Sequence, residues 1–130
     1  MQFFLPMIPP TATAQGHQVN TRGAQPRFYD PAPLVQARAK FEAFLAPHRP
    51  AAPLDGALRL TTKWCWPAAG KHKNGEYKAT RPDTDNLIKL LKDVMSDLGF
   101  WVNDARVASE ITEKFWADTP GIFVKIEVLK

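Results

Sequence analysis

Apolar and polar residues recur with the periods of strands and helices along most of the chain. Apolar side chains dominate residues 1–9, which predicts a strand that ends at a pair of prolines. Residues 11–29 show no period and are rich in Thr, Ala, Gln, Gly and Asn, so a long loop is predicted there. Asp30 as N-cap and Pro31 at the first helical position then predict an amphipathic helix that ends before Pro47.

Strand and helix patterns also follow one another in the second half of the chain. GALRLTTKWCWP, residues 56–67, alternates cleanly between two faces and predicts a strand. Residues 84–98 carry apolar side chains at spacings of three and four, as an amphipathic helix does, and Gly99 supplies its C-terminal stop. Residues 105–116 and 121–130 predict two further strands joined by a turn.

The predicted elements follow the order strand, helix, strand, helix, strand, strand. This order predicts an α+β fold in which a mixed four-stranded sheet packs against two main helices. A chain of 130 residues fits one domain, residues 1–130, with a real hydrophobic core. Its 45% apolar and 23% charged residues are ordinary for a globular protein.

Several kinds of protein and site are disfavoured by what the sequence lacks. No apolar run approaches the roughly 18 residues of a membrane span, and the first ten residues lack the features of a signal peptide. We therefore expect a cytoplasmic protein without membrane contact. The single cysteine, Cys65, excludes an internal disulfide and is expected to be inert within its strand. The three histidines do not combine with it at zinc-ligand spacing.

Positive charge is concentrated in the first part of the chain. Residues 1–82 contain eleven Lys and Arg against four Asp and Glu, whereas residues 83–130 contain six against nine. Cations favour phosphate binding and carboxylates favour metal binding, so this division is weak support for a nucleic-acid enzyme. The loop over residues 11–29 and the basic segment between Pro67 and Pro82 are each either solvated surface or DNA contacts. Their candidate DNA contacts are Arg22, Arg27, Lys71, Lys73, Lys78 and Arg81.

The run RPDTDNLIK, residues 81–89, raises a question about metal binding. Asp83 and Asp85 are two residues apart at the start of a helix, so both carboxylates can point toward one place. A simpler interpretation is equally open, in which Asp83 caps the helix and Asp85 pairs with Lys89. Asp104, in the turn before the next strand, can join the pair if that strand lies beside the N-terminal end of the helix.

Three carboxylates gathered in one place repel one another unless a cation joins them. Oxygen ligands without His or Cys suit Mg²⁺, with Mn²⁺ as the second candidate. The EF-hand pattern for calcium is not met, because Leu87 and Ile88 stand where an oxygen ligand and a glycine are needed. An aspartate-bound Mg²⁺ near basic loops indicates phosphoryl chemistry, with Lys89 placed to neutralise the phosphate or orient the attacking water.

The run RPDTDNLIKLLKDVMSDLGFWVNDARV resembles the core of the RusA-like endodeoxyribonucleases, Holliday junction resolvases of prophage and phage origin. Their motif, R/K-P-D-x-D-N-L-x-K-x-x-x-D followed by G-F-W and an acidic pair, is in step with this chain without a gap. The resemblance is strong over residues 81–115 and looser over the N-terminal strand and the PRFYDP segment. Where the family often has two adjacent acids, this chain has Asn103 and then Asp104.

The resemblance implies a role for individual residues. The family's metal-binding aspartates correspond to Asp83, Asp85 and Asp104, its catalytic lysine corresponds to Lys89, and Lys114 joins the candidate DNA contacts. The family also implies a homodimer that binds a four-way DNA junction and nicks two opposed strands symmetrically, with Mg²⁺ in each site. Two alternatives remain open: a less selective nuclease for branched DNA, and a non-catalytic DNA-binding protein whose acidic cluster is only a helix cap with ion pairs.

Overall fold

The structure, a computed structural model, describes residues 1–11, 18–20, 27–29 and 32–129, the two short middle segments by their backbone alone. Within this described part, no helix is long and apolar enough to cross a membrane. In chain order the elements are β1 (Gln2–Leu5), β2 (Gln18–Asn20), β3 (Arg27–Tyr29), α1 (Ala32–Leu45), the 3-10 helix η1 (Ala46–His48), β4 (Leu58–Pro67), α2 (Thr84–Asp97), the 3-10 helix η2 (Asp104–Arg106), β5 (Val107–Ala117) and β6 (Gly121–Val128).

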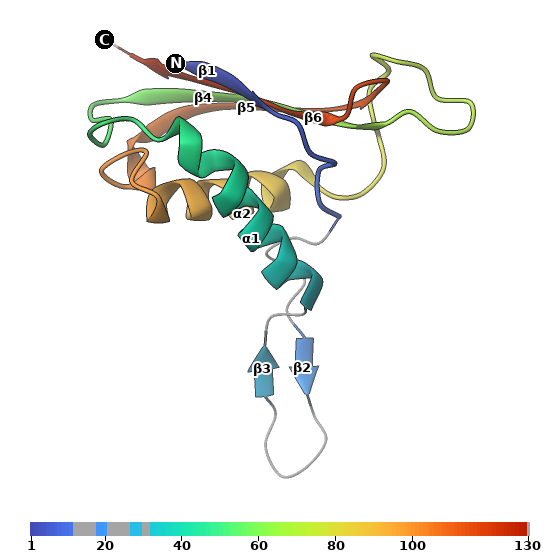
Figure 1. Cartoon of the computed structure of the whole chain (residues 1–130), viewed down its shortest axis with the longest axis horizontal. Coiled ribbons are helices and arrows are strands. Elements are labelled where there is room, and N and C mark those ends of the chain that lie inside the picture. The colour runs from blue at the N-terminus through green and yellow to red at the C-terminus, as the bar shows by residue number, and fades with distance from the viewer. Residues whose placement is uncertain (12–17, 21–26, 30–31, 130) are drawn as a thin grey trace.

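Four of the strands form one mixed sheet in the order β1-β6-β4-β5. β6 pairs antiparallel with both β1 and β4, whereas β4 and β5 run parallel. α1 and α2 lie on the same side of this sheet, as Figure 1 shows. The prediction of an α+β fold with a mixed four-stranded sheet and two main helices is therefore confirmed.

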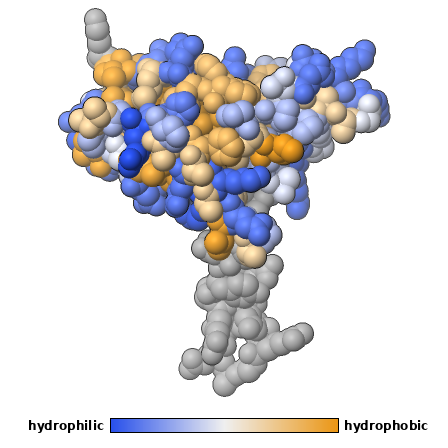
Figure 2. Space-filling model, viewed as in Figure 1, coloured by the Kyte–Doolittle hydropathy of each residue, from blue (hydrophilic) through white to orange (hydrophobic). Residues whose placement is uncertain are grey.

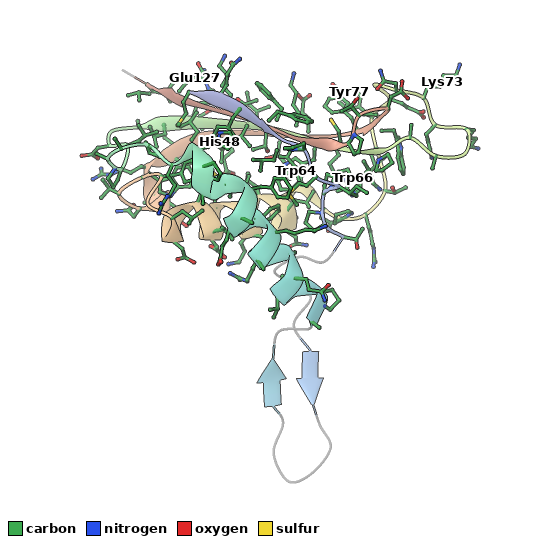
Figure 3. All side chains as sticks on the ribbon, viewed as in Figure 1. His48, Trp64, Trp66, Lys73, Tyr77 and Glu127 are labelled. Carbon is green, nitrogen blue, oxygen red and sulfur yellow. The ribbon has the colours of Figure 1, made fainter. Side chains whose placement is uncertain are left out.

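The hydrophobic core fills the space between the sheet and the two helices. The alternation of β4 turns every second side chain inward, and Figure 3 shows Trp64 and Trp66 on the helix side of the sheet. Trp64 is fully buried, and its ring meets the ring of Phe41 from α1 edge-on with centroids 6.0 Å apart. Its indole N–H donates to the buried hydroxyl of Thr62 at 2.8 Å, so both polar groups are satisfied.

The loop predicted over residues 11–29 is only partly correct. Residues 18–20 and 27–29 pair as the antiparallel strands β2 and β3, which form a separate two-stranded sheet. Strands of three residues are too short for an alternating pattern to show in the sequence. The predicted helices fare better, because α1 ends at Leu45 and α2 covers Thr84–Asp97, within a residue or two of expectation.

The side of the sheet away from the helices carries aromatic and charged side chains together with Cys65. Tyr77 lies there, stacked on Phe115 with ring centroids 4.8 Å apart (Figure 3). Its hydroxyl donates to the carboxylate of Glu113 at 3.1 Å, which raises the pKa of Tyr77. Cys65 is partly buried in β4, and burial raises the pKa of its thiol. A raised thiol pKa agrees with the expectation of an inert cysteine.

The parallel pairing of β4 and β5 fixes the direction of α2. The chain leaves the end of β4, passes through α2, and returns through η2 to the start of β5. α2 must therefore run back along the sheet, antiparallel to both strands. Two contacts agree with this direction, because Lys114 near the end of β5 reaches Pro82, while Lys92 pairs with Glu110 nearer the start of β5. Residues that flank α2 consequently lie at opposite ends of the sheet.

Candidate metal and nucleic-acid site

Two exposed carboxylates stand at the start of α2. Asp83 occupies the N-cap position with an extended backbone (φ −72°, ψ 147°), and Asp85 lies in the first turn. The side chain of Asp83 makes no capping hydrogen bond, so its carboxylate oxygens are not used by the helix. Asp83 therefore stands at the N-cap position, but its carboxylate does not act as a helix cap.

Lys89 lies one helical turn beyond Asp85 on the exposed side of α2. Its side chain is 64% exposed, and its ammonium lies 3.9 Å from a carboxylate oxygen of Asp93. An ion pair that is this long and exposed contributes little stability. Among the described residues, no ion pair joins Lys89 to Asp85, the pairing that the simpler interpretation required. The Lys89 ammonium is therefore accessible to a ligand bound at the start of α2.

Asp104 opens η2 at the other end of α2. The side chain of Asn103 accepts a hydrogen bond from the backbone N–H of Ala105 at 3.0 Å, and Arg106 pairs with Asp55 at 3.1 Å. These two contacts hold the short turn that carries Asp104. Asparagine and aspartate cap helices about equally well, and Asn103 serves here as the N-cap of η2.

An open hollow of about 430 Å³ adjoins Asp104. It is lined by Arg38 from α1, by Asp93, Ser96 and Asp97 from α2, and by residues 102–104. Three of these side chains are carboxylates, and all of the α2 residues come from the second half of the helix. Asp104 is thus part of an acidic surface at the C-terminal end of α2.

The structure does not bring Asp104 to Asp83 and Asp85 within one chain. A 14-residue helix is roughly 21 Å long, and these aspartates lie at its two ends. Among the described residues, no three His, Cys, Asp or Glu side chains are grouped to hold one metal ion. A site within one chain would require the start of β5 to lie beside the N-terminal end of α2. This requirement is not met, because β5 runs parallel to β4.

The loop between β4 and α2 carries several exposed cations. Hydrophilic residues predominate at the end of the molecule where this loop projects (Figure 2). Lys71, Lys73 and Arg81 are exposed, with Lys73 far out on the loop in Figure 3. These three side chains remain candidates for contact with DNA phosphates. Arg22 lies outside the described residues, and Arg27 is described in β3 only by its backbone.

Lys78 and Lys114 are placed differently from the other candidate DNA contacts. Lys78 is only 8% exposed, and its ammonium donates to the carbonyl oxygen of Arg81 at 2.7 Å. Lys114 donates to the carbonyl oxygens of Thr80 and Pro82 at 2.6 Å and 2.7 Å. Both ammonium groups are bound to the main chain just before α2. Nothing in the local sequence signals this arrangement, because the two lysines come from different elements.

A comparison with protein families supplies independent information about the chain. A family model described as Endodeoxyribonuclease RusA matches residues 7–127 of the 130 residues. The matched segment includes both ends of α2 and therefore all three aspartates and Lys89. A comparison with curated proteins gives no match.

Proposed function

The chain belongs to the endodeoxyribonuclease RusA family, and from this premise we propose that it resolves four-way (Holliday) DNA junctions by Mg²⁺-dependent phosphodiester hydrolysis in recombination and repair. The observation that carries the proposal is the exposed pair Asp83 and Asp85 at the start of α2, directly after a basic loop. Exposed carboxylates beside exposed cations are what a metal-dependent enzyme acting on DNA requires.

We assign Asp83, Asp85 and Asp104 as the residues that hold Mg²⁺, with Mn²⁺ as a substitute. Their donor set contains only carboxylate oxygens, which suits both hard cations, and the Asp83 carboxylate is not engaged in helix capping. When bound, the ion supplies charge stabilisation at the phosphate and lowers the pKa of an attacking water. The Lys89 ammonium, one turn from Asp85, offsets negative charge that develops on the phosphate.

The basic loop provides the DNA contacts in this proposal. Arg81 is exposed two residues before Asp83, so a phosphate that it holds lies close to the start of α2, whereas Lys71 and Lys73 contact the DNA farther out along the loop. Such contacts fix the position of the DNA backbone without reading its sequence. Arg22 and Arg27 are retained as further proposed contacts on the strength of the sequence alone.

The separation of the aspartates supports a homodimer. Each metal site is complete if Asp83 and Asp85 come from one copy and Asp104 comes from the other. A two-fold axis that sets the two α2 helices antiparallel then builds two identical sites. A four-way junction with two opposed strands to be cut matches an enzyme with paired, symmetry-related sites.

Mixing two inactive variants tests whether the site is shared between copies. Asp83→Asn and Asp104→Asn should each abolish cleavage, and a dimer containing one chain of each should have one wholly defective site and one intact site. An equal, fully exchanged mixture should regain about a quarter of the wild-type sites, and should nick one strand of the junction without the paired second nick. Cleavage products on denaturing gels report the result.

The matched control mixes Asp83→Asn with Asp85→Asn. These residues belong to the same end of α2, so every mixed dimer keeps a defect in both sites and should stay inactive. If the Asp83→Asn and Asp104→Asn mixture forms mixed dimers yet stays as inactive as this control, the shared site is wrong.

The function itself is tested on a synthetic four-way junction and a linear duplex of the same sequence. With Mg²⁺ the wild-type protein should cut the junction at two symmetric positions, and removal of the metal with EDTA should abolish cutting. The physical reason is that the carboxylates at the start of α2 cannot offset phosphate charge by themselves.

Each of the other outcomes would indicate a different function or mechanism. Equal cutting of the duplex would indicate a less selective nuclease, and tight junction binding without cutting would indicate a DNA-binding protein. Undiminished cutting in EDTA would contradict the metal-dependent mechanism.

A further inference from the structure

Lys78 is a buried lysine whose charge is held by two tryptophan rings. Its ammonium lies 5.3 Å from the ring centroid of Trp66 and 4.5 Å from that of Trp116. Within the described residues, no carboxylate pairs with it. Lysine is almost never this buried unless it is paired, and removing its charge from water costs free energy. The cation–π contacts offset part of that cost.

The environment of Lys78 opposes its charge. Burial lowers the pKa of the Lys78 ammonium, and the nearby charge of Lys114 lowers it further. An apolar side chain of similar shape would pack against the two indole rings without this cost. Folding stability therefore does not explain why a lysine occupies this position. The contacts of the Lys78 ammonium suggest another reason.

Lys78 and Lys114 hold three consecutive carbonyl groups immediately before Asp83. The Lys78 ammonium donates to Arg81, and the Lys114 ammonium donates to Thr80 and Pro82. Lys78 also donates to the hydroxyl of Thr80. The two lysines are tied to each other because the Lys78 backbone N–H donates to the Lys114 carbonyl at 3.0 Å.

This arrangement fixes the backbone that leads into the candidate metal site. Trp66 ends the inward row of β4 and Trp116 lies in β5, so the rings belong to the rigid sheet. The ammonium of Lys78 links those rings to the Arg81 carbonyl, two residues before Asp83. The Asp83 side chain itself makes no capping bond, so its direction follows from the backbone before it.

We propose that Lys78 is a positioning residue, whose ammonium, held over the rings of Trp66 and Trp116, orients the start of α2 so that Asp83 and Asp85 can bind a divalent cation. The effect of Lys78 on catalysis rests on the proposed function. This positioning role deepens that function by assigning Lys78 to support of the metal site, in place of DNA contact.

The test compares Lys78→Met with a matched control, Lys63→Met. Both changes remove one lysine charge, but Lys63 is exposed on β4 on the side of the sheet away from the helices. Binding of Mn²⁺, followed by electron paramagnetic resonance of the free ion, should weaken about 10- to 100-fold in Lys78→Met and stay unchanged in the control. Junction cleavage should need a correspondingly higher metal concentration, whereas junction binding in EDTA should be unchanged.

A second measurement does not depend on catalysis. The Leu87 amide donates to the Asp83 carbonyl at 3.2 Å in the first turn of α2, and the Leu98 amide donates to Val94 at the far end. Hydrogen exchange at Leu87 should become faster in Lys78→Met, while exchange at Leu98 should not change. Lys78→Arg, which keeps a cation over the rings, should recover much of the wild-type behaviour.

The outcomes separate this inference from the proposed function. Unchanged Mn²⁺ affinity together with unchanged Leu87 exchange in a folded Lys78→Met protein would overturn the positioning role, and wild-type cleavage would then still support the nuclease. If the wild type does not cut junctions, the proposed function fails, and the Leu87 exchange still decides whether Lys78 holds the start of α2.

Discussion

Asp83→Asn is expected to reduce junction cleavage by about 100- to 1000-fold, the size of effect seen when one group that stabilises transition-state charge is removed. The change replaces one proposed metal-binding oxygen by an amide that does not attract a cation. The fold should be unaffected, because Asn is as good an N-cap as Asp and the Asp83 side chain makes no capping bond. Cleavage rates at saturating junction and thermal unfolding curves measure the two effects separately.

The control for this change is Asp118→Asn. Asp118 is an exposed aspartate in the turn between β5 and β6, so its replacement removes the same charge without changing a proposed metal ligand. It should cleave like the wild type. A cleavage rate for Asp83→Asn within a few-fold of Asp118→Asn would remove Asp83 from the mechanism and return it to the role of a helix-cap residue.

The second large effect is on stability. Trp64→Ala should lower the free energy of unfolding by about 3–5 kcal/mol, the usual cost of truncating a fully buried tryptophan. The substitution leaves a cavity beside Phe41 and deprives the buried Thr62 hydroxyl of its donor. Urea unfolding, followed by circular dichroism, measures the change.

Two matched variants separate burial from aromatic character. Trp64→Phe keeps a ring in the core and should cost less than Trp64→Ala. Tyr77→Ala removes an aromatic ring that is 66% exposed and should cost less than about 1 kcal/mol. Equal losses for Trp64→Ala and Tyr77→Ala would mean that Trp64 is not central to the core.

Local patterns predict most of the helices and the main strands in this chain. α2 is predicted within a residue because its apolar spacing, its N-cap aspartate and Gly99 all agree on one element. β4 is predicted because every second side chain is buried, so that apolar and polar residues alternate along the strand. β2 and β3 are missed because each is too short to show a period.

The site is predictable in its residue types but not in its arrangement. Asp83, Asp85 and Lys89 are close in sequence, so the start of a helix is enough to predict how they lie relative to one another. The position of Asp104 depends instead on whether β5 runs parallel or antiparallel to β4, which no local pattern decides. The role of Lys78 depends on Trp66 and Trp116 meeting across two strands, so the sequence indicates only a basic loop.

The strand order β1-β6-β4-β5 has a consequence for how the chain folds. No two neighbours in this sheet are joined by a hairpin, and the paired residues of β4 and β5 are already about fifty positions apart, with the β1 and β6 pairs still more distant. The entropy of closing these long segments must be lost before any pairing in the sheet returns free energy. Such non-local topologies fold slowly for their size, and they leave unpaired strand edges exposed while the chain searches for its partners.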